Sequence, residues 1–176
     1  MTEPRIHRRI VRNRKKGAVP LSNLRTCDVV RTVVDNPRRL EELLRMLEDK
    51  DRGVRGRAAA TLARLSESHP DRLIRLVARF KDSLEDDAAY VRWHLAYALG
   101  RLGSRFPSQS PEFLNHLVLC LEDHNRVVRI IGCRALARIA ARKSSVVETF
   151  FRDLKKEIPP SVARLLRRSK PKSPRR

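Results

Sequence analysis

Apolar residues in the middle of the chain recur with the spacing of an α-helix. Taking Val54 as the zero angle and 100° per residue, Ala58, Thr61, Leu62 and Leu65 all lie within about 80° of it. This pattern predicts a helix with one buried face. Strict alternation of apolar and polar residues does not occur in any segment, so we expect no β-sheet.

A second apolar stripe lies upstream of the first, and polar residues separate the two. It consists of Leu40, Leu43, Leu44 and Leu47, and the acidic stretch 49–51 follows it. Two amphipathic helices joined by a short polar turn form a helical hairpin. We predict three hairpins, near residues 37–66, 71–104 and 111–142. A capping helix should precede them, from Ser22 to Val34, and a further capping helix should follow at 145–157.

The hairpin is written three times at a constant interval of 37 residues. The positions that agree or nearly agree are Leu47, Asp49, Val54, Arg55 and Leu62, together with their counterparts 37 and 74 residues later. An internal repeat of this kind indicates a stacked array, in which each unit buries its apolar face against its neighbours.

The pattern Asp-x-x-x-x-Val-Arg, followed by small and apolar residues and by Leu-x-x-Leu, resembles the HEAT repeat. It begins at Asp49, Asp86 and Asp123, and the resemblance covers roughly residues 37–143. It implies an all-α fold: a right-handed α-solenoid of about three HEAT-like hairpins, with an N-terminal capping helix and a C-terminal half-repeat. It also implies that the second helices line a concave surface. The residues that it assigns to ties between units are Asp49, Asp86, Asp123, Arg55, Arg92 and Arg129.

Charge divides the chain into three parts. The net charge is +20, and a large share of it lies at the two ends. Residues 1–20 hold seven Lys/Arg against one acid, and residues 161–176 hold seven Lys/Arg and no acid. We therefore predict a flexible basic arm at 1–20, a repeat domain at 21–160 and a disordered basic tail at 161–176. Charge gathered in this way favours an anionic partner over a general effect on solubility.

Composition argues against several other classes of protein. No apolar run approaches the ~20 residues that a membrane span requires, and no apolar segment follows the basic N-terminus, as a secretory signal would require. Three scattered cysteines suit reduced thiols inside a cell. His116, Cys120 and His124 recur every four residues, but Asp123 should end that helix, so we expect no metal site. We predict an intracellular protein that is monomeric and has no cofactor.

The expected second helices, at 52–65, 90–102 and 126–142, contain no Asp or Glu. The faces of these helices opposite the apolar stripe carry small, aromatic and basic residues, including Gly56 and Gly100. These helices would line a basic concave groove. The candidate binding residues in the groove are Arg57, Arg64, Trp93, His94, Tyr97, Arg101, Arg134 and Arg138, and those in the N-terminal arm and the C-terminal tail are Arg12, Lys15, Lys16, Arg167 and Arg168. The structural alternative is that Trp93 packs against a neighbouring helix and that the arginines are solvated.

Cations and flat aromatic faces together are the ingredients of a nucleic-acid surface. We therefore predict a non-enzymatic scaffold that binds DNA or RNA without sequence specificity. One alternative is an adaptor that grips an acidic protein. A second is a HEAT-like DNA glycosylase, a family with aromatic residues and a catalytic Asp in a basic groove. Tyr97 stands where that carboxylate would be needed, so the general base is missing.

Overall fold

The computed structural model describes residues 19–142 and 144–157. Within these ranges every regular element is a helix and no β-strand occurs, which confirms the all-α prediction. The α-helices are α2 (Thr26–Asp35), α3 (Leu40–Arg45), α4 (Arg52–Ser68), α5 (Pro70–Leu73), α6 (Ala89–Arg105), α7 (Pro111–Leu119), α8 (Arg126–Ala140) and α9 (Ser145–Glu157). Short 3₁₀ segments lie between them: η2 (Leu21–Asn23), η3 (Pro37–Arg39), η4 (Met46–Glu48), η5 (Ile74–Arg79), η6 (Lys81–Glu85), η7 (Pro107–Gln109) and η8 (Cys120–Glu122).

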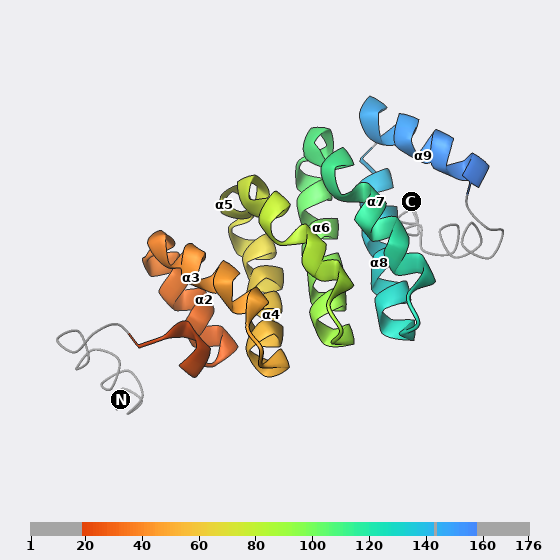
Figure 1. Cartoon of the computed structure of the whole chain (residues 1–176). Coiled ribbons are helices and arrows are strands. Elements are labelled where there is room, and N and C mark those ends of the chain that lie inside the picture. Colours follow the sequence, from red (N-terminus) through yellow and green to blue (C-terminus); the bar gives the residue numbers. More distant parts are fainter. Residues whose placement is uncertain (1–18, 143, 158–176) are drawn as a thin grey trace, which may run out of the picture.

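The three longest helices, α4, α6 and α8, begin 37 residues apart and lie side by side (Figure 1). The shorter segments α3, α5 and α7 lie in front of them in this view and form a second layer. Helix α6 packs against α4 on one side and against α8 on the other. The sequence repeat therefore corresponds to a repeat of structure, and the long helices form a continuous layer.

Side chains in the preceding turns cap the N-termini of two of the three long helices, α4 and α8. Asp51 accepts a hydrogen bond from the backbone N–H of Gly53 at 2.7 Å, and Asn125 accepts one from Val127 at 2.9 Å. The bonds of Asp51 and Asn125 satisfy amide groups that the start of a helix leaves without partners. Helix α6 has no side-chain cap, and the Asp86 carboxylate instead accepts a hydrogen bond from the N–H of Ala88, the residue before this helix, at 2.8 Å. The acidic turns thus have a structural role.

The core runs through both layers at positions that the repeat predicts. Leu62, Leu99 and Leu136 are counterparts 37 residues apart, and all three are fully buried. Phe80 and Phe113, in the layer of shorter segments, are fully buried too. Because these side chains belong to one connected cluster, each unit shares its apolar core with its neighbour.

Small residues allow the long helices to approach one another closely. A Cβ atom on Gly100 would lie 2.5 Å from the Cβ of Ala135, and one on Gly56 would lie 2.1 Å from the Tyr90 ring. Both glycines are buried. The prediction that Gly56 and Gly100 face an open groove is therefore wrong, because both glycines lie in contacts between adjacent long helices.

The N-terminal cap differs in detail from the prediction. Ser22 does not cap α2, which begins at Thr26 after the separate turn η2. Leu21 in this turn is fully buried, and its N–H donates to the Glu42 carboxylate at 2.7 Å. Burial of Leu21 holds the turn against the first unit. Helix α2 then packs against α4.

Candidate nucleic-acid interface

Ion pairs link each unit to the next. The Arg55 guanidinium donates to Asp86 from Nε at 2.6 Å, and that of Arg92 donates to Asp123 from Nε at 2.7 Å and from Nη2 at 2.9 Å. The Nη1 groups of both arginines donate to carbonyl oxygens of their own turns. The same bond pattern thus recurs at both joints.

The ends of this series differ from its middle. The Asp49 carboxylate accepts the N–H of Asp51, and Arg129 donates to the carbonyl oxygens of residues 123 and 124. Within the described residues, neither forms an ion pair with another unit. Four of the six Asp and Arg residues assigned to ties therefore pair across joints, and these two do not.

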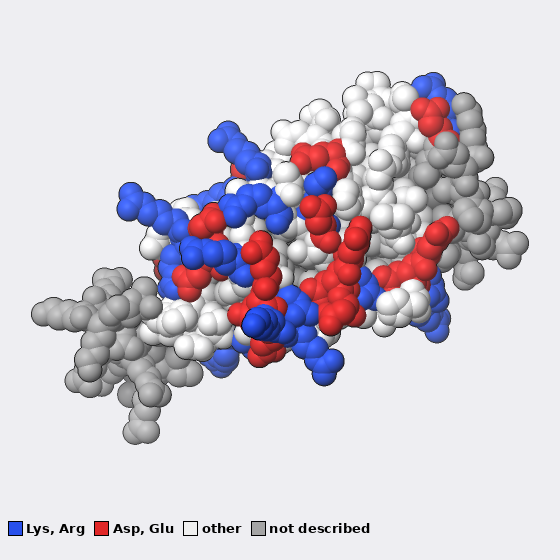
Figure 2. Space-filling model, in the orientation of Figure 1, with Lys and Arg blue, Asp and Glu red and all other residues white. Residues whose placement is uncertain are grey.

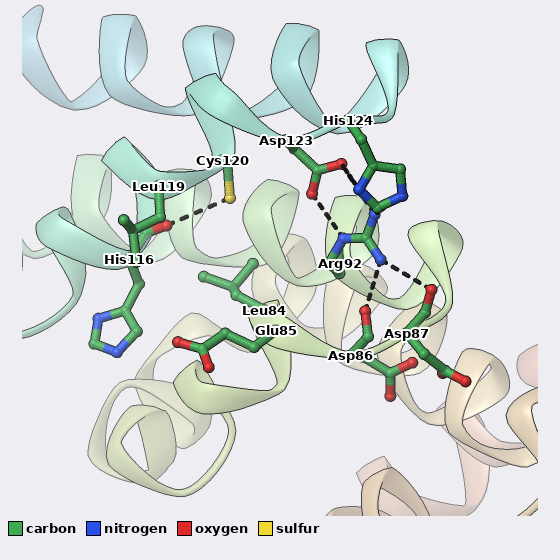
Figure 3. A pocket seen from close by; sticks show the side chains of 10 residues that line it. All are labelled: Leu84, Glu85, Asp86, Asp87, Arg92, His116, Leu119, Cys120, Asp123 and His124. Atoms are coloured by element: carbon green, nitrogen blue, oxygen red, sulfur yellow. Dashed lines mark hydrogen bonds and ion pairs between the residues drawn. The ribbon is translucent and has the colours of Figure 1, made fainter.

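A hollow of about 340 Å³ opens beside the second tie (Figure 3). Cys120 donates from Sγ to the carbonyl oxygen of His116 at 3.4 Å, and burial raises the pKa of this thiol to about 12. The His124 ring lies on the Asp123 side of the hollow, away from the His116 ring. No group of metal ligands is present in the part of the chain that the structure describes. A thiol with so high a pKa is also a poor nucleophile at neutral pH.

A larger hollow of about 750 Å³ lies where the C-terminal ends of α4, α6 and α8 meet the start of α5. Five arginines line it, and we call it the arginine cleft. They are Arg101, Arg105, Arg134, Arg138 and Arg142. They follow i, i+4 spacing along α6 and along α8 and the turn after it, which places each set on one helix face. The cleft therefore presents two rows of guanidinium groups.

None of these five arginines forms an ion pair with a carboxylate in residues 19–142 and 144–157. Their position near helix C-termini is favourable, because the partial negative charge there stabilises cations. Rows of unpaired guanidinium groups can donate to phosphate oxygens with good geometry.

Two carboxylates lie at the edge of the cleft, and the sequence had placed none there. Helix α4 continues past the expected end at residue 65 to Ser68, so it includes Glu67. Glu67 accepts a hydrogen bond from the Tyr97 hydroxyl, and this bond raises the pKa of Tyr97. Asp71 in α5 is the second carboxylate. The cleft therefore keeps an excess of positive charge.

Tyr97 joins the arginine cleft to the aromatic residues nearer the start of α6. The Cζ atom of Arg138 lies 5.9 Å from the centre of its ring, within the range of a cation–π contact. The Trp93 and His94 rings lie about one turn earlier, with their centres 3.5 Å apart. Both are partly buried, and Trp93 packs against the core.

His94 carries little charge at neutral pH. Burial lowers its pKa to about 4, and the nearby Arg64 guanidinium adds to this shift. A neutral imidazole cannot neutralise a phosphate, although it can stack on a base or a sugar. The cationic part of the surface near α4 is supplied by Arg64, which is exposed.

The structure brings Arg101, Arg134 and Arg138 together in one cleft, with Tyr97 beside them. It separates Arg57 from this group, because Arg57 donates to the carbonyl oxygen of Ser22 at 2.9 Å and thereby holds the N-terminal turn. The predicted arm residues lie outside the described residues. They are Arg12, Lys15, Lys16, Arg167 and Arg168.

Sequence reasoning missed Arg105 and Arg142. They are counterparts 37 residues apart, and each follows the predicted Arg101 or Arg138 by four residues. Extending the repeat comparison by one helical turn would have found both. No comparable sequence pattern indicated Ser66 and Ser104, which also line the cleft.

No helix among the described residues is long and apolar enough to cross a bilayer. Comparison with known proteins adds no further constraint on function. The chain matches no protein-family model, and a search of curated proteins finds no matching relative.

Proposed function

We propose that the protein is a non-enzymatic scaffold that binds nucleic acid without reading its sequence, and that the arginine cleft is the centre of its binding surface. The helical repeat is in our interpretation a HEAT-like right-handed α-solenoid of three hairpins, with α2 and α9 as its caps. The observation that carries the proposal is the pair of guanidinium rows, which form no ion pairs within the described residues.

The side chains that line the cleft are suited to contacts with phosphate groups. Guanidinium groups bind phosphate oxygens strongly, and such contacts fix position without carrying sequence information. Tyr97, Trp93 and His94 add aromatic surface on which a base or sugar can stack. Residues 1–20 and 161–176 would add sequence-independent contacts from their Lys and Arg side chains. The protein would act as an intracellular monomer.

A charge-reversal experiment tests the role of the cleft. The double variant Arg101→Glu, Arg138→Glu should bind a short fluorescein-labelled DNA duplex about tenfold or more weakly, because one cation in each of the two rows becomes an anion. The control is Arg52→Glu, Arg126→Glu, which makes the same change in net charge at exposed positions outside the cleft. Fluorescence anisotropy measures both, and circular dichroism checks the fold.

Equal loss of affinity in the cleft variant and the control would contradict the proposal, since binding would then follow net charge alone. An adaptor for an acidic protein remains the alternative use of the same cleft. Its test is recovery of a protein partner that survives nuclease treatment and is lost in the cleft variant.

One observation favours a second candidate function, that of a DNA glycosylase. Glu67 supplies a carboxylate at the cleft, which a DNA glycosylase needs as a general base. Its hydrogen bond to Tyr97 keeps it engaged within the protein. Release of a base from alkylated DNA, lost in Glu67→Gln, would favour this activity over simple binding.

A further inference from the structure

Another hollow, of about 600 Å³, lies in the layer of shorter segments, between the first helical segments of units one and two. Its floor is apolar and consists of Leu40, Leu44 and Leu76, and its rim carries Arg38, Arg72 and Arg75. We call it the outer groove. Helix α3 forms one wall and η5 forms the other, and none of the five arginines of the arginine cleft lines it.

The apolar floor is partly open to solvent. Leu44 is buried, whereas Leu40 and Leu76 pack against the core and remain half-buried. An exposed apolar hollow with a polar rim is typical of a surface that a partner covers. The floor suits an aliphatic side chain, which a phosphate backbone does not provide.

The charge on the rim is unbalanced. Arg38, Arg72 and Arg75 are exposed, and none pairs with a carboxylate in the described part of the chain; Arg72 donates to the carbonyl oxygen of Val34, at 3.1 Å. Glu41, by contrast, is held by Arg79 at 2.6 Å and is therefore neutralised. Of the two acids that line the groove, this leaves Asp71 to offset three arginines. The rim has a net positive charge that a ligand could balance.

The basic rim is confined to this joint. Arg75 is the counterpart of Arg38 one repeat later, but the next counterpart is Glu112. The space-filling view agrees, because Lys and Arg side chains gather over the region of α3 and α5, while acids are frequent towards α6 and α8 (Figure 2). The arginines of the groove are thus a local feature and not a property copied into every unit.

We propose that the outer groove binds an acidic amphipathic segment of a partner protein, with aliphatic side chains on the leucine floor and carboxylates on the arginine rim. One helix face with apolar residues at i and i+4, flanked by Asp or Glu, presents both chemistries at once. The outer groove shares only Asp71 with the arginine cleft, so nucleic acid in the cleft and a peptide in the groove would lie next to each other and the protein would join the two ligands.

The test uses a fluorescein-labelled glutamate-rich peptide with leucines at i and i+4, and a second peptide of equal charge with serines in their place. The full-length protein should bind the leucine peptide about tenfold more tightly, because only that peptide covers the floor. Arg38→Glu, Arg75→Glu should weaken this binding about tenfold, whereas Arg52→Glu, Arg126→Glu should not. Chemical-shift mapping should place the peptide on α3 and η5.

Three results would overturn the proposal. Equal affinity for the two peptides would show attraction by charge alone, and shifts confined to the arginine cleft would place the peptide elsewhere. A dimer of the protein that dissociates on Arg38→Glu, Arg75→Glu would show that a second copy fills the groove. Binding of the DNA duplex should survive this double variant, so loss of the peptide site and loss of the cleft can be told apart.

Discussion

Two arginine–carboxylate pairs in this protein show how strongly burial changes the role of the same contact. The Arg92–Asp123 pair is nearly covered, with side chains 5% and 10% exposed, whereas the Arg79–Glu41 pair is about half exposed. Solvent screens the second pair, and such contacts add little to stability. Removing one partner of the first would leave a buried charge without compensation.

Asp123→Asn should therefore reduce the free energy of unfolding at pH 7, by about 2–4 kcal/mol. Burial alone would raise the pKa of Asp123, but hydrogen bonds from Arg92 and from the Asn125 N–H outweigh it and lower the pKa. A lowered pKa means that this stabilisation is complete above the normal value near 4 and fades as the pH falls through the folded value. The difference between wild type and variant should shrink accordingly. Denaturation at pH 7, 4 and about 2.5 measures it.

Glu41→Gln serves as the control for this prediction. Because the pair between Glu41 and Arg79 is exposed, the stability of this variant should stay close to that of the wild type at pH 7. If Asp123→Asn proves as stable as Glu41→Gln, the tie between units two and three has no structural role.

At the scale of residues, the repeat relates only some of the cleft residues to one another. Arg101 and Arg138 occupy equivalent positions and both line the cleft, whereas Arg64, the third member of this series, does not line it. Arg57 belongs to no such series of arginines, since the residues 37 and 74 positions later are His94 and Ile131. The contact of Arg57 with the N-terminal turn depends on how that turn folds back, and local periodicity contains no information on this.

At the scale of the elements, the distances between long helices depend on small side chains. Gly100 lies so close to α8 that a Cβ atom there would be 2.7 Å from the Cα atom of Ala135. Backbone cannot move aside as the end of a flexible side chain can. The contact therefore requires glycine, although glycine disfavours a helix interior.

Gly100→Ala should destabilise the protein by about 1–3 kcal/mol, because overpacking outweighs the gain in helix propensity. The double variant Gly100→Ala, Ala135→Gly should recover part of this loss, since it moves the missing methyl group to the other helix. Chemical denaturation gives both values. A single variant as stable as the wild type would mean that α6 and α8 can separate without cost.

Element boundaries explain the main errors in the predicted site. The helical pattern predicted α4, α6 and α8 correctly in kind, but α4 and α6 both continue three residues beyond the expected ends at Leu65 and Leu102. The apolar pattern ends before these last turns, because residues 66–68 and 103–105 are serine, glycine and charged residues. Glu67 and Arg105 both lie in these added turns, which is why the cleft was only partly anticipated.

For the whole molecule, positive charge gathers in several places: the two terminal segments, the arginine cleft and the rim of the outer groove. Formal net charge is +20, and residues 1–20 and 161–176 hold fourteen of the forty Lys and Arg side chains. Composition alone predicted an anionic partner. It could not indicate which layer carries the cleft, because that depends on how the units stack.

Binding of duplex DNA should weaken steeply with salt. If about six phosphates are neutralised, log affinity should fall against log salt with a slope near −5. The variant Arg101→Glu, Arg138→Glu loses two cations of the cleft, so its slope should be shallower by about 2. Anisotropy titrations from about 50 to about 300 mM salt give both slopes. A flat dependence for the wild type would argue against phosphate binding.

The repeated Arg–Asp tie has a consequence for how such a protein can change in length. Both joints between units have the same ion pair, Arg55 with Asp86 and Arg92 with Asp123. A duplicated 37-residue unit would carry both an Asp and an Arg of this pattern, six residues apart, so it could accept from the unit before it and donate to the unit after it. Growth by tandem duplication would therefore leave no mismatched joint behind, and each added copy would extend the row of arginines on the long helices.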